Sequence, residues 1–172
     1  GHVARSISII HQLNLQNNTV FVACSENQKK IFLDYFPNIN YIQHNDYPFS
    51  FKGKGNFTLD LLLALPTLNK RLNLEKNEVK KLIKNHKIDI CISDHRYGFQ
   101  YQECTSIFIT HQLSLPLPFL YKFVNSLHQQ LIKKFNYIWV LDTENSLYAG
   151  KLSVNKKFKN LYYIGIQSRF GL

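Results

Sequence analysis

Two clusters of polar residues, each placed directly after an apolar segment, hold the side chains best suited to chemistry. The segment 88–92 alternates isoleucine with other residues and leads into Ser93–Gly98, and the apolar segment 107–109 leads into Thr110–Gln112. Each segment has the length and composition of a buried strand. Ligands of open parallel sheets bind beyond the carboxyl ends of the strands. The two clusters therefore predict one shared site at that edge of a sheet.

The first cluster could bind and activate a hydroxylated substrate. The carboxylate of Asp94 could orient or deprotonate a sugar hydroxyl, and Arg96 could hold a phosphate through two hydrogen bonds. A structural Asp94–Arg96 pair that shapes the loop is the alternative. In the second cluster, His111 and Gln112 either face the ligand or serve as buried polar groups that need partners.

The start of the chain suggests a further contribution. Gly1 and His2 stand before the apolar-periodic segment Val3–Leu15, which predicts a helix. A helix N-terminus favours phosphate, and a histidine there could accept a proton near neutral pH; a capping or exposed histidine is the alternative. Because the sequence opens in mid-motif without methionine, we expect a first strand and a Gly-rich turn to precede it.

The remaining pattern alternates strands with helices. Strands are predicted at 19–24, 39–42, 137–141 and 161–164, and helices at 25–35, 57–68, 73–85 and 119–135. This order predicts an α/β protein with a Rossmann-like parallel sheet, helices on both faces and its first strand missing. The Gly- and Lys-containing segment 45–56 reads as a loop that either closes over an anion or is a solvated connection.

Composition indicates one compact domain, 1–164, which the chain leaves at 165. Hydrophobic residues make up 45% and charged residues 19% of the 172 residues, as in ordinary globular proteins. No apolar run approaches the roughly 20 residues that span a bilayer. The three scattered cysteines lack metal-site spacing and fit a reducing cytoplasm. The net charge of +10 favours anionic partners: phosphate-bearing substrates, anionic membranes or nucleic acid.

Four short motifs follow one another along the chain. They are Gly1-His2, Asp94-His95-Arg96-Tyr97-Gly98, Thr110-His111-Gln112-Leu113 and Gly165-Ile166-Gln167-Ser168-Arg169-Phe170. With them the chain resembles the N-terminal domain of a two-domain (GT-B type) nucleotide-sugar glycosyltransferase, similar to glycosyltransferase family 28 and to bacterial and archaeal predicted glycosyltransferases. The resemblance covers nearly the whole chain. It departs from the pattern at His95, where the similar group has Asn.

The resemblance implies the acceptor-side half of an enzyme. Residues 165–172 would begin a linker to a C-terminal domain that binds a nucleotide-sugar donor, UDP-linked by this likeness, so that 1–172 alone would be nearly inactive. The acceptor would be a glycan or a lipid-linked glycan, and the location cytoplasmic or peripheral on the inner face of an anionic membrane. Transfer would use a general base without a metal or cofactor. The base would be His2 or Asp94, and the substrate-binding residues would be Gly1, Arg5, Arg96, Tyr97, Thr110, His111, Gln112 and Arg169.

Two other functions compete with transfer. One is a non-catalytic α/β module that binds a phosphorylated glycan or a nucleotide. The other is a nucleic-acid-binding domain, suggested by the net charge and ten tyrosines. Against nucleic acid, the lysines are spread over several elements and no recognised motif occurs, so we expect no nucleic-acid partner.

Overall fold

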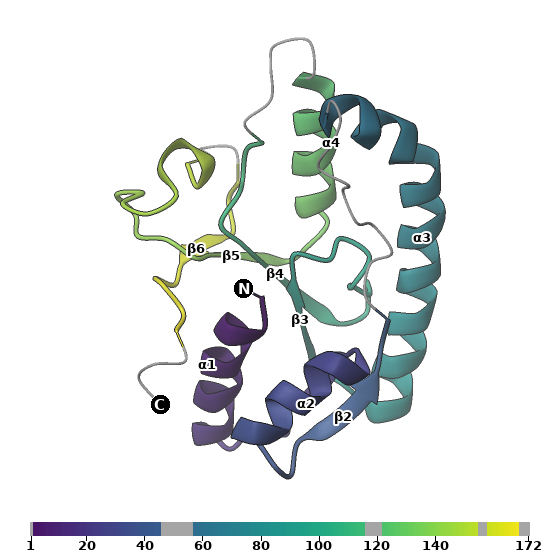
Figure 1. The fold of residues 1–172 in the computed structure, drawn as a ribbon, viewed down its shortest axis with the longest axis vertical. Coiled ribbons are helices and arrows are strands. Elements are labelled where there is room, and N and C mark those ends of the chain that lie inside the picture. The colour runs from purple at the N-terminus through teal and green to yellow at the C-terminus, as the bar shows by residue number, and fades with distance from the viewer. Residues whose placement is uncertain (1, 46–56, 116–121, 155–157, 169–172) are drawn as a thin grey trace. The chain divides into compact units, whose positions relative to one another are not determined.

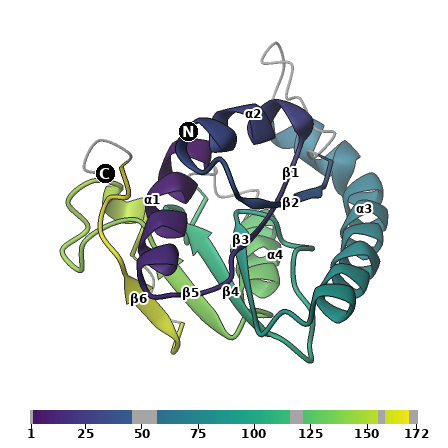
Figure 2. The same cartoon turned by 90° about the horizontal axis from the view of Figure 1, so that it is seen from below.

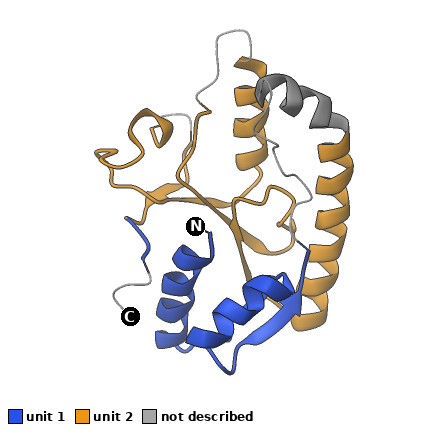
Figure 3. Ribbon diagram, in the orientation of Figure 1, with its two compact units in different colours: residues 1–50, 166–172 blue, residues 51–165 orange. Residues whose placement is uncertain are grey.

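The chain forms two compact units in a computed structural model that describes residues 2–45, 57–115, 122–154 and 158–168, with the backbone alone for 57–66. Unit 1 comprises residues 1–50 and 166–172, and unit 2 comprises residues 51–165 (Figure 3). Of the described part of the predicted linker, Gly165 belongs to unit 2 and residues 166–168 group with the N-terminal segment. Within unit 1, Ser8 Oγ donates a hydrogen bond to Gln167 Oε1 at 3.0 Å.

Unit 1 is a β-α-β arrangement preceded by a helix. Its elements in chain order are α1 (His2–Leu15), β1 (Phe21–Cys24), α2 (Glu26–Tyr35) and β2 (Asn40–Gln43). The two strands are parallel, with Phe21 opposite Asn40. Helix α2 begins as predicted at Ser25, whose backbone N–H donates to Gln28 Oε1 at 3.2 Å. Side chains from both helices and from β1 form the buried core of the unit: Ile7, Ile10, Val22, Cys24 and Phe32.

Unit 2 carries a four-stranded parallel sheet. Its elements are α3 (Phe57–His86), β3 (Ile90–Asp94), β4 (Thr105–Thr110), α4 (Lys122–Ile132), β5 (Tyr137–Val140), the 3₁₀ turn η2 (Gly150–Leu152) and β6 (Leu161–Tyr163). The strands lie in the order β3-β4-β5-β6, and every neighbouring pair is parallel (Figures 1 and 2). Sequence order and spatial order coincide, so the carboxyl ends of all four strands share one edge.

The helices of unit 2 pack on the sheet face that carries Cys91, Phe108 and Val140. Because registered partners in a parallel pair point to the same side, Cys91 and Ser106 share this face, as do Ser93 and Phe108. Helix α3 contributes Val79 and Ile83 to the cluster around Cys91. Helix α4 and the turn after it contribute Ile132 and Phe135 to the cluster around Phe108, Ile138 and Val140.

The α/β class predicted from the sequence is confirmed: parallel strands in two sheets are flanked by helices, consistent with a Rossmann-like fold. One element was predicted wrongly. Residues 57–68 and 73–85 were expected to form two helices, yet α3 is continuous from Phe57 to His86. The polar stretch between them contains residues with only slightly unfavourable helix propensity, and Leu72, which is buried, gives this turn a packing contact.

The structure also bears on the cysteines, on membrane-spanning helices and on the segment after β2. All three cysteines are buried free thiols. None of the helices in the described residues is long and apolar enough to cross a membrane. The segment 46–56, predicted to be a loop, lies outside the described residues.

Candidate functional site

The two polar clusters meet at the carboxyl edge of the unit 2 sheet. Strand β3 ends at Asp94 and β4 ends at Thr110, and the two strands are hydrogen-bonded neighbours with Asp94 opposite Ile109. The side chains of Asp94 and His111 are partly exposed, whereas Thr110 is fully buried. This strand-end site therefore combines an accessible carboxylate and imidazole with a buried hydroxyl.

A left-handed turn at His95 links the two strand ends. Its φ of 60° lies in the region that non-glycine residues adopt rarely, with asparagine, aspartate and histidine the most tolerant. The backbone N–H of His95 donates to Ile109 O at 3.2 Å, and Thr110 Oγ1 lies 3.1 Å from His95 Nδ1. Thr110 Oγ1 also accepts from the Gln112 N–H at 2.9 Å. Thr110 is thus a junction between both turns.

His128 of α4 hydrogen-bonds to the turn after β3 and to the turn after β4. Its Nε2 lies 3.0 Å from Gln112 O, and its Nδ1 lies 2.7 Å from the Tyr97 hydroxyl. Since a carbonyl oxygen only accepts, Nε2 carries the proton and Nδ1 accepts from Tyr97. Burial lowers the pKa of His128, although the bond to Gln112 O opposes this shift, which agrees with a neutral ring. Burial likewise raises the pKa of Tyr97.

Aromatic rings surround His95. The centroid of its ring lies 6.2 Å from that of His111, 6.4 Å from His128, 5.9 Å from Tyr97 and 5.6 Å from Phe108. Three imidazoles and a phenol therefore gather at one strand edge. In the residues that the structure describes, no group of histidine, cysteine or acidic side chains has an arrangement that could hold a metal ion.

Arg96 is held by a carboxylate that the sequence reading overlooked. Its Nε lies 2.5 Å from Glu75 Oε1, and the Glu75 side chain is only 5% exposed. Ser93, fully buried, fixes the turn by donating to Arg96 O and accepting from Arg96 N–H. The guanidinium was expected to bind phosphate. Its Nε–H group instead ties it to Glu75 of α3. Glu75 did carry a signal: it follows Leu72 by three residues and precedes Val79 by four, so it stands on the apolar stripe of its helix.

Gly98 lets this turn approach α3 closely. A Cβ at position 98 would lie 2.9 Å from Leu72 O and 2.4 Å from Glu75 Oε2. Real Cβ atoms do not come this near to backbone oxygen, so any other residue would push the turn away from the helix. The Glu75–Arg96 pair and Gly98 together fix the position of the first cluster.

A second overlooked residue is Asp142, which is fully buried at the end of β5. Its carboxylate accepts hydrogen bonds from the N–H groups of Thr143, Tyr148 and Ala149 at 2.7, 3.1 and 3.0 Å, and from Ser153 Oγ at 2.6 Å. Burial alone would raise the pKa of Asp142, but these hydrogen bonds outweigh it and lower the pKa to about 2. The loop 143–153 is folded around this charge, and Leu152 O accepts from the N–H groups of Leu113 and Ser114.

Acid is expected to release this loop. Because the pKa of Asp142 is lower in the folded chain than its ordinary value of 3.8, the folded state gains stability above pH 4 and loses it as the pH falls through about 2. Urea unfolding at pH 4, 3 and 2 should show a steeper loss for the wild type than for Asp142→Asn, which starts less stable because its amide places N–H groups against donors. Equal acid slopes would contradict this account.

The other predicted site residues lie in unit 1 or outside the described residues. His2 is exposed at the start of α1, and its Nδ1 accepts from Arg5 Nη2 at 2.5 Å. Gly1 and Arg169 lie outside the described residues. The structure thus brings together Asp94, Arg96, Tyr97, Thr110, His111 and Gln112 in unit 2, and His2 with Arg5 in unit 1.

Comparison with known proteins adds no relative. A scan against protein-family models, a search of curated proteins and a search of solved structures each returned no match for this chain.

Proposed function

We propose that this chain is the acceptor-side part of a glycosyltransferase that moves a sugar from a UDP-linked donor to a hydroxyl of a glycan or lipid-linked acceptor. The observation that carries the proposal is the convergence of Asp94, His111 and the Thr110 junction at the carboxyl edge of β3 and β4. This edge is where α/β sheets bind their ligands. The ordered motifs supply the reaction class.

The partly exposed side chains suit an acceptor hydroxyl. Asp94 and His111 both offer groups that accept a proton, and each stands at the end of a buried strand that fixes its backbone. The Thr110, Tyr97 and His128 hydrogen bonds hold the two turns in register. In this scheme Asp94 is the general base from unit 2, His2 is the competing base from unit 1, and Arg96 positions the turn rather than binding phosphate.

The decisive test is turnover by the native gene product that contains this chain. A panel of UDP-sugars with glycan and lipid-linked acceptors is assayed for UDP release, and one donor is expected to be consumed. If Asp94 is the base, Asp94→Asn should lower kcat by about 10²–10⁴-fold. Asp89→Asn, an exposed residue directly before the other end of the same strand, is the matched control and should leave kcat unchanged.

Three results would change the proposal. A large loss in His2→Ala with an active Asp94→Asn would move the base to unit 1. Saturable binding of a sugar or nucleotide at the strand-end residues without turnover would favour a binding module. Neither turnover nor binding of any member of the panel would remove the glycosyltransferase proposal.

A further inference from the structure

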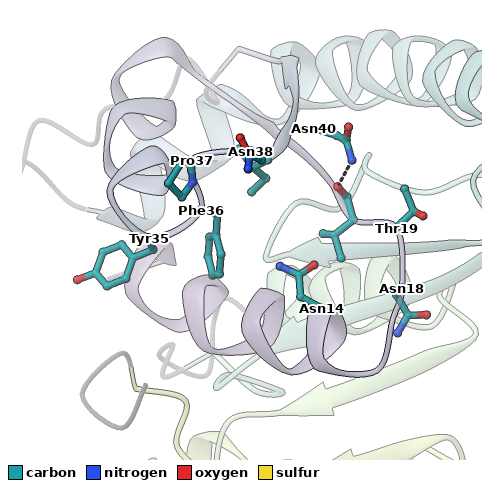
Figure 4. A pocket seen from close by; sticks show the side chains of 10 residues that line it. Asn14, Asn18, Thr19, Tyr35, Phe36, Pro37, Asn38 and Asn40 are labelled. Atoms are coloured by element: carbon teal, nitrogen blue, oxygen red, sulfur yellow. Dashed lines mark hydrogen bonds between the residues drawn. The ribbon is translucent and has the colours of Figure 1, made fainter.

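Unit 1 contains a pocket of about 460 Å³ at the amino-terminal ends of its strands. Its walls come from the C-terminal ends of α1 and α2 and from the residues that lead into β1 and β2 (Figure 4). The volume falls within the range of small-molecule sites. Nothing in the strand-end chemistry of unit 2 uses this pocket, because all its lining residues belong to unit 1.

The pocket is uncharged in a strongly basic chain. None of its ten lining residues carries a charge, although the chain has a net charge of +10. The polar lining consists mainly of four asparagine amides and one threonine hydroxyl: Asn14, Asn18, Asn38, Asn40 and Thr19. A charged ligand would find no counter-charge among these exposed side chains. The lining therefore selects a neutral, hydrogen-bonding ligand.

Two of the amides are fixed by the backbone. Asn18 Nδ2 donates to Leu13 O at 3.0 Å, and Asn40 Nδ2 donates to Val20 O at 3.1 Å, the dashed line in Figure 4. Each bond orients the amide and leaves its Oδ1 to accept from a ligand. In the described part of the chain, no hydrogen bond engages the side chain of Asn14 or Asn38. These two amides offer both donors and an acceptor.

Two aromatic rings, Tyr35 and Phe36, contribute to the apolar wall. Phe36 is half-buried, packs against the core of unit 1 and lines the pocket together with Tyr35, whose ring centroid lies 6.5 Å away (Figure 4). Its N–H donates to Phe32 O at 2.8 Å, which anchors its backbone at the end of α2, and Pro37 stiffens the chain after it. The half-buried ring of Phe36 beside several amides matches a pyranose, whose C–H face packs on the ring while its hydroxyls both donate to and accept from amides.

We infer that this pocket is a binding site for a neutral saccharide, separate from the strand-end site. The inference does not rest on glycosyl transfer, because it uses only the lining of unit 1. A nucleobase fits less well, because a flat heterocycle is best held between two parallel ring faces, whereas the rings of Tyr35 and Phe36 are tilted by 45° with their centroids 6.5 Å apart.

The test is a titration of the ¹⁵N-labelled chain with methyl glycosides of glucose, galactose and N-acetylglucosamine, read from backbone and asparagine side-chain amide signals. One glycoside is expected to shift the signals of Asn14, Asn18, Asn38 and Asn40 with a dissociation constant on the order of 1 mM. The double variant Asn14→Ala/Asn38→Ala should weaken binding at least tenfold. Alanine is favourable in α1, so this variant keeps the fold, which its dispersed spectrum will verify.

The controls separate this site from the proposed transferase site. Asn27→Ala, an exposed asparagine of α2 outside the pocket, should bind like the wild type. Asn38→Asp, which keeps the size of the side chain but replaces its donors with a charge, should bind several-fold more weakly. Shifts confined to 94–97 and 110–112, equal binding by the double variant, or stronger shifts with uridine than with every glycoside would each overturn the saccharide pocket.

Discussion

Replacing Glu75 by alanine is expected to lower the free energy of unfolding by about 3 kcal/mol, the lower end of the cost of breaking a buried ion pair. The Glu75 side chain is 5% exposed and that of Arg96 is 22% exposed, so the guanidinium left behind regains only part of its hydration. The loss should appear as a lower urea midpoint with an unchanged m-value.

Replacing both partners together tests whether the loss comes from the charge that is left unpaired. Glu75→Leu combined with Arg96→Met, which replaces both charges with apolar side chains, should recover most of the stability that Glu75→Ala loses. Glu78→Ala, at an exposed position one turn along α3, should change stability by no more than about 0.5 kcal/mol. A loss below about 1 kcal/mol in Glu75→Ala would mean that the ion pair does not hold the first cluster.

Replacing His128 by glutamine is expected to cost about 1–3 kcal/mol at pH 7.5, because the Tyr97 hydroxyl and Gln112 carbonyl lose well-placed partners in a buried environment. The difference between the two proteins should shrink in acid. The pKa of His128 is lower in the folded chain than its ordinary 6.5, so its contribution is present above pH 6.5 and is lost as the pH falls towards the folded value.

Urea unfolding of wild type and variant at pH 7.5, 6.5, 5.5 and 5.0 measures this difference. Its slope below pH 6.5 should be positive with rising pH and no steeper than about 1.4 kcal/mol per pH unit, the limit for one proton. His95, whose ring centroid lies 6.4 Å from that of His128, is present in both proteins, so the comparison isolates the change at position 128. A difference that stays constant across this range would show that His128 does not titrate with unfolding.

The sequence predicted the fold class and most elements because apolar periodicity and turn residues are local signals. The strand predicted at 137–141 is β5, and the helix predicted at 119–135 contains α4. The continuous α3 was missed because its middle is polar in sequence, and only packing at Leu72 and Glu75 distinguishes it from a break. The same division holds for the candidate site: residues in local motifs could be predicted, and residues fixed by distant partners could not.

The polar clusters at the strand ends could be found from the sequence, whereas the residues that hold them in place could not. Thr110 and Tyr97 lie within recognisable motifs, but the partners that fix the turns come from distant elements: His128 from α4 and Glu75 from α3. In the sequence, Asp142 looks like any carboxylate that follows a short strand. Only the folded loop shows the four donors that surround it, the last of them eleven residues away. The position of Glu75 on an apolar stripe indicates that it is buried, but no pattern in the sequence indicates that its hydrogen-bond partner is Arg96.

The left-handed backbone at His95 limits what this position can become. Asparagine tolerates φ near 60° as histidine does, so an exchange between the two preserves the turn while removing an imidazole from the strand edge. A β-branched residue such as valine would strain the backbone before any ligand is involved.

In a saturation library selected only for folding, position 95 should retain a narrow set of asparagine, aspartate, glycine and histidine. Position 111, whose histidine also lies at a strand end, should accept many residues in the same library, and a narrowing there under selection for activity would separate the demands of the ligand from those of the backbone.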